Sequence, residues 1–133
     1  MPWNPILSIG VEKIDKQHEA LFQKAEALFE AGKNGKSKEY IGELLSFLGE
    51  YTVTHFRDEE AYMAAIGYPG LAEQKQQHKG FIDHFTALKG EYERSGGKIL
   101  LILNANKFII DWLTQHISVE DKKIGEFAKQ AGK

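Results

Sequence analysis

Five polar residues interrupt the apolar stripes of this chain at positions where a packed helix would face inward. Apolar side chains recur every three or four residues around them, which is the repeat of an amphipathic helix. An unpaired polar group inside a protein costs about 1–3 kcal/mol, so this many in a small domain need a common partner. Imidazole and carboxylate together bind iron, zinc, manganese or copper. The five inward positions are His18, His55, Glu59, His78 and His116.

The spacing of these residues indicates how they could meet. His55 and Glu59 are four residues apart, which places both on one face of a helix. His116 and Asp121 are five residues apart, and an ideal α-helix would separate them by about 140°. They converge only if the helix ends there or is locally distorted, as in the π-bulges found at functional sites. With Asp121 included, the set exceeds the needs of one ion, and two ions bridged by Glu59 and Asp121 would use it economically.

An ordinary structural explanation exists for any one of these residues. A single histidine on an apolar face is more often a core residue than a ligand, but four of them on four segments, with a carboxylate at helical spacing, favour a metal site. In the acidic run Asp58-Glu59-Glu60 we expect only Glu59 to point inward and its neighbours to be solvated. Gln17, Gln77 and Gln115 each precede a predicted ligand. They are candidate partners for histidine ring N–H groups, as are backbone carbonyls and acids on neighbouring helices.

Turn signals divide the chain into the elements that must position this set. Gly32–Gly35, Gly67–Gly70 and Ser95–Gly97 separate four segments that are long enough for helices, the second of them capped by Ser37. The first helix is expected from about Asp15 to Ala31. Short connections between amphipathic helices predict an all-α fold, namely an antiparallel up-down-up-down four-helix bundle.

The two ends of the chain are expected to add small elements to this bundle. Two prolines within the first five residues predict an extended N-terminal arm that carries Trp3. A short C-terminal helix is expected from about Asp121 to Ala131. Residues 1–133 are therefore expected to form a single domain.

Composition narrows the classes of function. A formal net charge of -2 gives no electrostatic case for nucleic acid or anionic lipid. The chain has no cysteine, which excludes disulfides, iron–sulfur clusters and thiolate zinc sites and leaves nitrogen and oxygen ligands for a metal. It has no apolar run of about 20 residues and no signal-peptide pattern at its start, so we expect no membrane span and a cytoplasmic location. A monomer is expected.

The same residues carry a family resemblance over nearly the whole chain. Asp15-Lys16-Gln17-His18, His55-Phe56-Arg57-Asp58-Glu59, His78, and Trp112–His116 followed by Asp121 resemble the bacterial hemerythrins. The resemblance implies two non-haem iron ions that share a bridging oxo or hydroxo group and bind dioxygen reversibly. It assigns Glu59 and Asp121 as bridging carboxylates, and it implies metal ligation by His18, His55, His78 and His116.

The sequence departs from the family at one ligand position. The family has a further histidine four residues before His78, where this chain has Gln74. Three outcomes are open: the Gln74 amide oxygen binds the metal weakly, a water or anion held by Gln74 fills the gap, or the second iron is held weakly. We interpret the protein as an oxygen carrier, store or sensor. The alternatives are a di-iron oxidase-like, peroxidase-like or nitric-oxide-reactive enzyme, favoured by Gln74, and an iron-storage or metal-buffering protein. The residues expected to line a dry oxygen pocket are Phe22, Phe56, Trp112 and Ile117.

Overall fold

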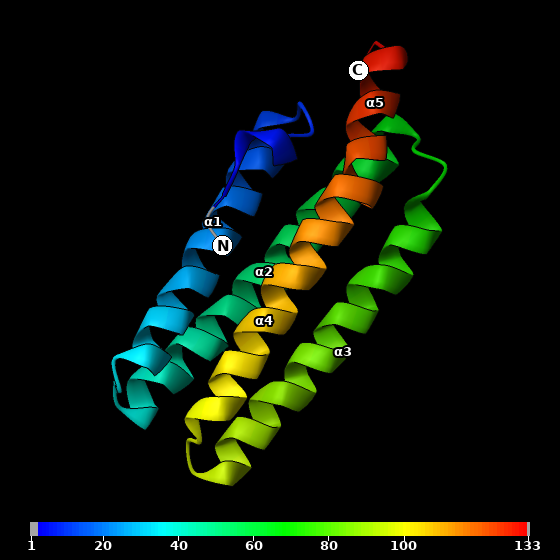
Figure 1. The fold of residues 1–133 in the computed structure, drawn as a ribbon. Coiled ribbons are helices and arrows are strands. Elements are labelled where there is room, and N and C mark those ends of the chain that lie inside the picture. Colours follow the sequence, from blue (N-terminus) through cyan, green and yellow to red (C-terminus); the bar gives the residue numbers. More distant parts are fainter. Residues whose placement is uncertain (1–2, 133) are drawn as a thin grey trace.

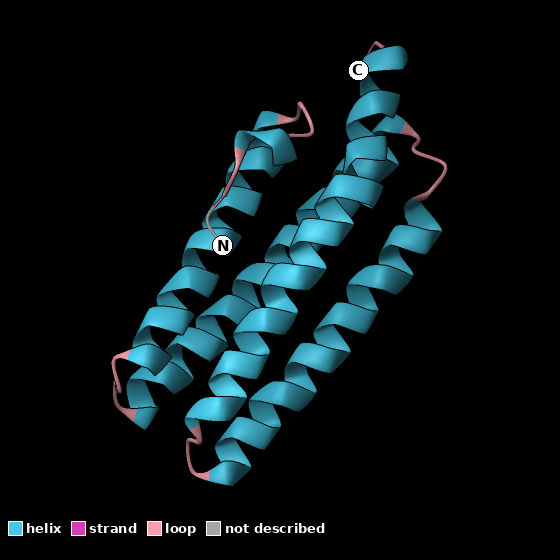
Figure 2. Cartoon of the chain, in the orientation of Figure 1, coloured by secondary structure: helices cyan, strands magenta, loops and turns pink. Residues whose placement is uncertain are grey.

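The computed structural model describes residues 3–132 and shows a bundle of helices (Figure 1). Its long elements are α1 (Glu12–Lys33), α2 (Lys38–Ile66), α3 (Leu71–Ser95) and α4 (Ile99–Gln115). A 3₁₀ turn, η1 (Pro5–Leu7), precedes α1, and a π-helical segment, η2 (His116–Asp121), joins α4 to the short α5 (Lys122–Gln130). Within the described residues there is no β-strand (Figure 2), which confirms the predicted all-α class.

The four long helices run antiparallel around a common core. α1 packs against α2 and α4, and α3 packs against the same two helices from the other side (Figure 1). Consecutive helices are joined by short turns, so the chain passes up and down the bundle without a long crossover. This arrangement confirms the predicted up-down-up-down topology. No helix within residues 3–132 combines the length and the apolar content needed to span a membrane.

Local sequence signals explain where the helices begin and end. The Ser37 hydroxyl accepts a hydrogen bond from the backbone N–H of Tyr40 at 3.1 Å, which caps the N-terminus of α2 as predicted. Gly67 (φ 72°) and Gly96 (φ 78°) end α2 and α3 in the left-handed conformation that glycine adopts at little cost. The predicted turns are therefore present, although α1 begins at Glu12 rather than near residue 15.

The N-terminal arm is fastened to the bundle by Asp15. Its carboxylate accepts hydrogen bonds from the Ser8 hydroxyl at 2.6 Å and from the Ile9 N–H at 2.8 Å. Trp3 packs on the bundle as predicted, and its ring centroid lies 6.0 Å from that of Phe22. On the other side of the arm, the backbone of Gly125 in α5 lies so close to the Ile9 carbonyl that a Cβ atom at position 125 would overlap it. The arm and α5 are thus packed together.

Candidate metal centre

The six predicted ligands and Gln74 meet in the interior of the bundle. None of the seven is more than 5% exposed. α1 contributes one of them, α2 two, α3 two and η2 two. In that order, they are His18, then His55 and Glu59, then Gln74 and His78, and then His116 and Asp121.

The π-helical segment brings the last two of these residues together. In a π-helix the backbone bonds join residues five apart, so His116 and Asp121 lie on the same face. The Nε2 atom of His116 is 3.2 Å from Oδ1 of Asp121. The local distortion that their spacing required is therefore present.

Each carboxylate lies between two pairs of histidines. Oε1 of Glu59 is 3.0 Å from Nε2 of His78, whereas Oε2 is 3.5 Å from Nε2 of His18 and 3.6 Å from that of His55. Oδ1 of Asp121 faces His116, and Oδ2 is 3.1 Å from Nε2 of His18. Two groups result: the first half of the centre holds His18 and His55, and the second half holds His78 and His116. The carboxylates are shared between the halves.

Hydrogen bonding does not account for these close approaches. Several site atoms are buried and have no hydrogen-bond partner among the described residues: both ring nitrogens of His18, both carboxylate oxygens of Glu59, Oε1 of Gln74, Nε2 of His78, Nε2 of His116 and Oδ2 of Asp121. Atoms bound at about 2.1 Å to one first-row metal ion lie about 3.0–3.4 Å from one another. The observed separations of 3.0–3.6 Å are similar. The donor set therefore fits metal ions.

The centre carries negative charge from its two carboxylates. Burial by itself raises the pKa of Asp121, but His116 and His18 outweigh it and hold that pKa well below its usual range. The pKa of Glu59 is lowered by His18 and His78 against the opposing effects of burial and of Asp121. Ionised carboxylates are the form that binds a cation.

The histidines respond differently to the same surroundings. Burial alone would lower the pKa of His18, but the Asp121 and Glu59 carboxylates raise it to about 9. For His55 burial dominates and lowers the pKa to about 4. Against burial, Glu59 and then Glu60 raise the pKa of His78. A cation bound between the two carboxylates would compensate their negative charge.

Two side chains hold the outer nitrogens of histidines, and both are of kinds considered from the sequence: Gln17 was a candidate partner, and Glu60 is an acid on a neighbouring helix. Gln17 on α1 accepts from Nδ1–H of His55 on α2 at 2.7 Å, and Glu60 accepts from Nδ1–H of His78 at 2.8 Å. The expectation that both neighbours of Glu59 are solvated was wrong. Glu60 is half-buried against α3, and Asp58 is half-buried and accepts from the Gln17 amide at 2.9 Å. Successive helix positions point about 100° apart, which turns these acids toward the adjacent helices.

Aromatic rings pack on the second half of the centre. Phe56 stacks on His78 with centroids 3.9 Å apart and an interplanar angle of 2°, and Trp112 stacks on His116 at 4.3 Å and 13°. Phe22 and Ile117 are fully buried, and Phe22 packs against Trp3. Whether these four side chains line an oxygen pocket stays a prediction.

Gln74 faces the centre, as its place on the stripe predicted. Its amide Nε2 donates to Oδ1 of Asp121 at 3.1 Å. Its Oε1 atom is buried and has no hydrogen-bond partner among residues 3–132. The amide group of Gln74 is thus buried beside Asp121, with its oxygen unpaired.

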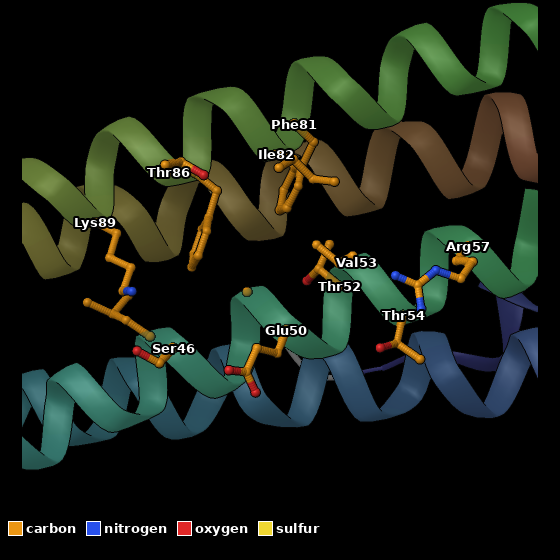
Figure 3. A pocket seen from close by; sticks show the side chains of 13 residues that line it. Ser46, Glu50, Thr52, Val53, Thr54, Arg57, Phe81, Ile82, Thr86 and Lys89 are labelled. Atoms are coloured by element: carbon orange, nitrogen blue, oxygen red, sulfur yellow. The ribbon is translucent and has the colours of Figure 1, made fainter.

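Two surface grooves lie near the centre. One, of about 470 Å³, runs between α2 and α3 over Phe81 and Phe85 (Figure 3). None of the predicted ligands lines it, although Phe81 packs edge-on against Phe56 behind it. The other, of about 490 Å³, is lined in part by His116, Trp112 and Glu120. The second groove therefore reaches a predicted ligand directly from the surface.

Buried histidines and carboxylates shared among four helices define a cation-binding helical bundle, and sequence comparison agrees. The profile of the family described as "Hemerythrin HHE cation binding domain" matches residues 9–128. The chain belongs to the hemerythrin family.

Named relatives share nearly the full length of the chain. It is 30% identical over 127 residues to the bacteriohemerythrin of Clostridium acetobutylicum, covering 91% of this chain and 95% of the relative. Identity to myohemerythrin-1 of Phascolopsis gouldii is 30% over 121 residues, covering 91% and 88%. Among solved structures, a wild-type hemerythrin crystal structure matches with a TM-score of 0.85 and 28% identity over 95% of each chain.

Proposed function

We propose that this protein binds two iron ions and, through them, dioxygen in a reversible manner. The observation that supports this most strongly is the arrangement of Glu59 and Asp121. Each of these carboxylates has one oxygen near the first half of the centre and the other oxygen near the second half. Membership of the hemerythrin family and the similarity to bacteriohemerythrins support iron as the metal and dioxygen as the ligand. The histidines are proposed to bind through Nε2.

The side chains of the bundle hold and shield this centre. When bound, the iron pair supplies the electrons that dioxygen takes up on binding and returns on release. Gln17 and Glu60 fix the outer nitrogens of His55 and His78, which leaves Nε2 of each ring free to bind metal. The buried side chains of Phe22, Phe56 and Ile117 are proposed to keep bulk water away from the centre. A dry site retains charged groups and slows proton entry.

The proposal is tested by loading the protein with Fe²⁺ without air. Metal analysis should find two iron ions per chain, and exposure to air should produce a visible absorption band that disappears on purging with argon. Repeated cycles should restore the same band. Binding of fewer than two ions, or the lack of any oxygen-dependent spectrum, would contradict the proposal.

Gln74 supports a second candidate function, a di-iron enzyme that consumes dioxygen, peroxide or nitric oxide. With an amide in place of an imidazole at position 74, the second half has one fewer strong ligand, and a coordination position would be open to a small molecule. With excess reductant present, continuous oxygen uptake at an electrode, or turnover of peroxide or nitric oxide, would favour the enzyme. A single stoichiometric uptake would favour the oxygen-binding protein.

A further inference from the structure

The outer hydrogen bonds of the two halves differ in charge. His78 donates from Nδ1 to the carboxylate of Glu60 at 2.8 Å, whereas His55 donates from Nδ1 to the amide oxygen of Gln17 at 2.7 Å. The Gln17 amide cannot exchange the positions of its oxygen and nitrogen without losing a hydrogen bond, because its nitrogen donates to Asp58 at 2.9 Å. One ring is therefore held by an anion and the other by a neutral group.

This difference changes how strongly each ring can bind a metal. A carboxylate that accepts from the outer ring N–H makes the inner nitrogen a stronger donor than a neutral amide does. The orientation of His78 is fixed as well, since Phe56 stacks on its ring at 3.9 Å. With both constraints, Nε2 of His78 points at Glu59, 3.0 Å away.

The half that receives this support is the one that contains Gln74. An amide oxygen is a weaker ligand for iron than imidazole, so this half binds its ion less tightly than it would with a histidine at position 74. Glu60 follows Glu59 directly on α2, so one helix supplies both a carboxylate inside the centre and a carboxylate behind a ligand.

We propose that Glu60 is a positioning residue whose charge compensates for Gln74 and keeps the second metal ion bound. It acts through His78, because its carboxylate accepts from Nδ1 on the outer side of that ring. The proposal rests on the metal-binding part of the proposed function, and it predicts that loss of the Glu60 charge affects one metal ion and spares the other.

The test is an anaerobic Fe²⁺ titration of the wild type and Glu60→Gln, followed by competition with a chelator. Glu60→Gln keeps a hydrogen-bond acceptor and removes only the charge. One of two binding steps should weaken about 10- to 100-fold while the other stays unchanged. Equal weakening of both steps, or no weakening, would overturn the proposal.

Glu120→Gln is the matched control. Glu120 directly precedes Asp121 as Glu60 directly follows Glu59, and the two side chains have similar exposure, 20% and 26%. Glu120 pairs with Lys123 at 3.7 Å, and within residues 3–132 it has no hydrogen bond to a histidine. Its loss should leave both steps unchanged, and equal weakening in both variants would show that general charge, and not Glu60, is responsible.

A double-mutant cycle separates compensation from general support. In the Gln74→His background, Glu60→Gln should weaken the affected step less than about threefold, because the restored imidazole makes the compensation unnecessary. The same loss in both backgrounds would contradict compensation. If Glu60→Gln lowers the helix content measured by circular dichroism, Glu60→Asp replaces it. Its shorter side chain no longer reaches Nδ1, so the same step must weaken, and unchanged affinity would again overturn the proposal.

The two proposals fail in different ways. A wild type that binds two ions, one of them sensitive to Glu60, but shows no oxygen-dependent spectrum would contradict dioxygen binding alone. A wild type that binds dioxygen reversibly and a Glu60→Gln variant with unchanged metal affinities would contradict the role of Glu60 alone.

Discussion

The two halves of the centre are alike inside and different outside. Each presents two imidazoles and one oxygen from each shared carboxylate. Behind the first half, the neutral amide of Gln17 holds His55. The N-terminal arm places the ring centroid of Trp3 6.5 Å from that of His18. Behind the second half are the Glu60 carboxylate, two stacked aromatic rings and an open groove. The comparison shows that similar ligand sets can be made unequal by the residues that hold them.

Loss of a shared carboxylate should abolish the distinction between the halves. Glu59→Gln removes a charge that faces both histidine pairs, so affinity for both ions should fall by more than about 100-fold, beyond the usual effect of a supporting residue. Anaerobic Fe²⁺ titration measures the change, with Glu120→Gln as the control for lost charge. If one ion still binds at wild-type affinity, Glu59 belongs to only one half.

Metal binding should stabilise the fold. The free energy of unfolding should rise by about 3–4 kcal/mol for each bound ion when Fe²⁺ is present at 100 to 1,000 times its dissociation constant, because the unfolded chain lacks the assembled site. Urea unfolding under argon, with and without Fe²⁺, measures the difference. Glu59→Gln should show little of this stabilisation. Equal stability of the wild type with and without metal would mean that the buried centre is already satisfied.

Restoring a histidine at position 74 should make the second half richer in imidazole than the first. In Gln74→His, we expect the lifetime of the oxygen-bound protein to increase about tenfold, or about 1.4 kcal/mol in barrier, because the added ligand closes an open position. Stopped-flow and slow spectral decay measure the lifetime. Gln76→His places the same residue at an exposed position of α3 and should have no effect. An unchanged lifetime in Gln74→His would remove the argument for a consuming enzyme.

The smallest effect on metal binding is expected where the arm packs against α5. Gly125→Ala forces a Cβ atom into the backbone carbonyl of Ile9, which Asp15 holds in place, so it should cost about 1–3 kcal/mol, the usual range for overpacking. Urea unfolding measures this cost, and a change in tryptophan fluorescence, to which Trp3 contributes, reports movement of the arm. Gly42→Ala meets no atom within 4 Å and should instead stabilise α2 by about 0.5–1 kcal/mol. Equal effects at both positions would show that the arm packs loosely.

Helical periodicity predicted most of the inner face from the sequence. It placed His18, Glu59 and Gln74 inside because a core-facing position depends only on the helix repeat. The distortion between His116 and Asp121 also followed, since no regular helix could bring them together.

The sequence suggested glutamines next to the ligands and acids on neighbouring helices as partners of the histidine rings, but it could not show which side chain pairs with which ring. Glu60 binds His78 only because α2 packs beside α3 in one register, and the pairing of Gln17 with His55 depends in the same way on α1 and α2. The relative position of two packed helices is set by contacts between them, and it does not appear in the hydrophobic repeat of either helix alone. A usable signal was nevertheless present. An acid one residue after an inward ligand points about 100° away, toward the neighbouring helix rather than into solvent.

The π-helical segment has a consequence for anyone who would build this centre into another scaffold. A designer who copied the histidines and carboxylates onto four ideal α-helices would place Asp121 on the wrong side of its helix. The transferable unit therefore includes the widened turn from His116 to Asp121 as well as its side chains. Deletion of one residue from that turn, such as Ser118, would leave His116 and Asp121 four residues apart, the spacing at which a regular α-helix presents both side chains on one face.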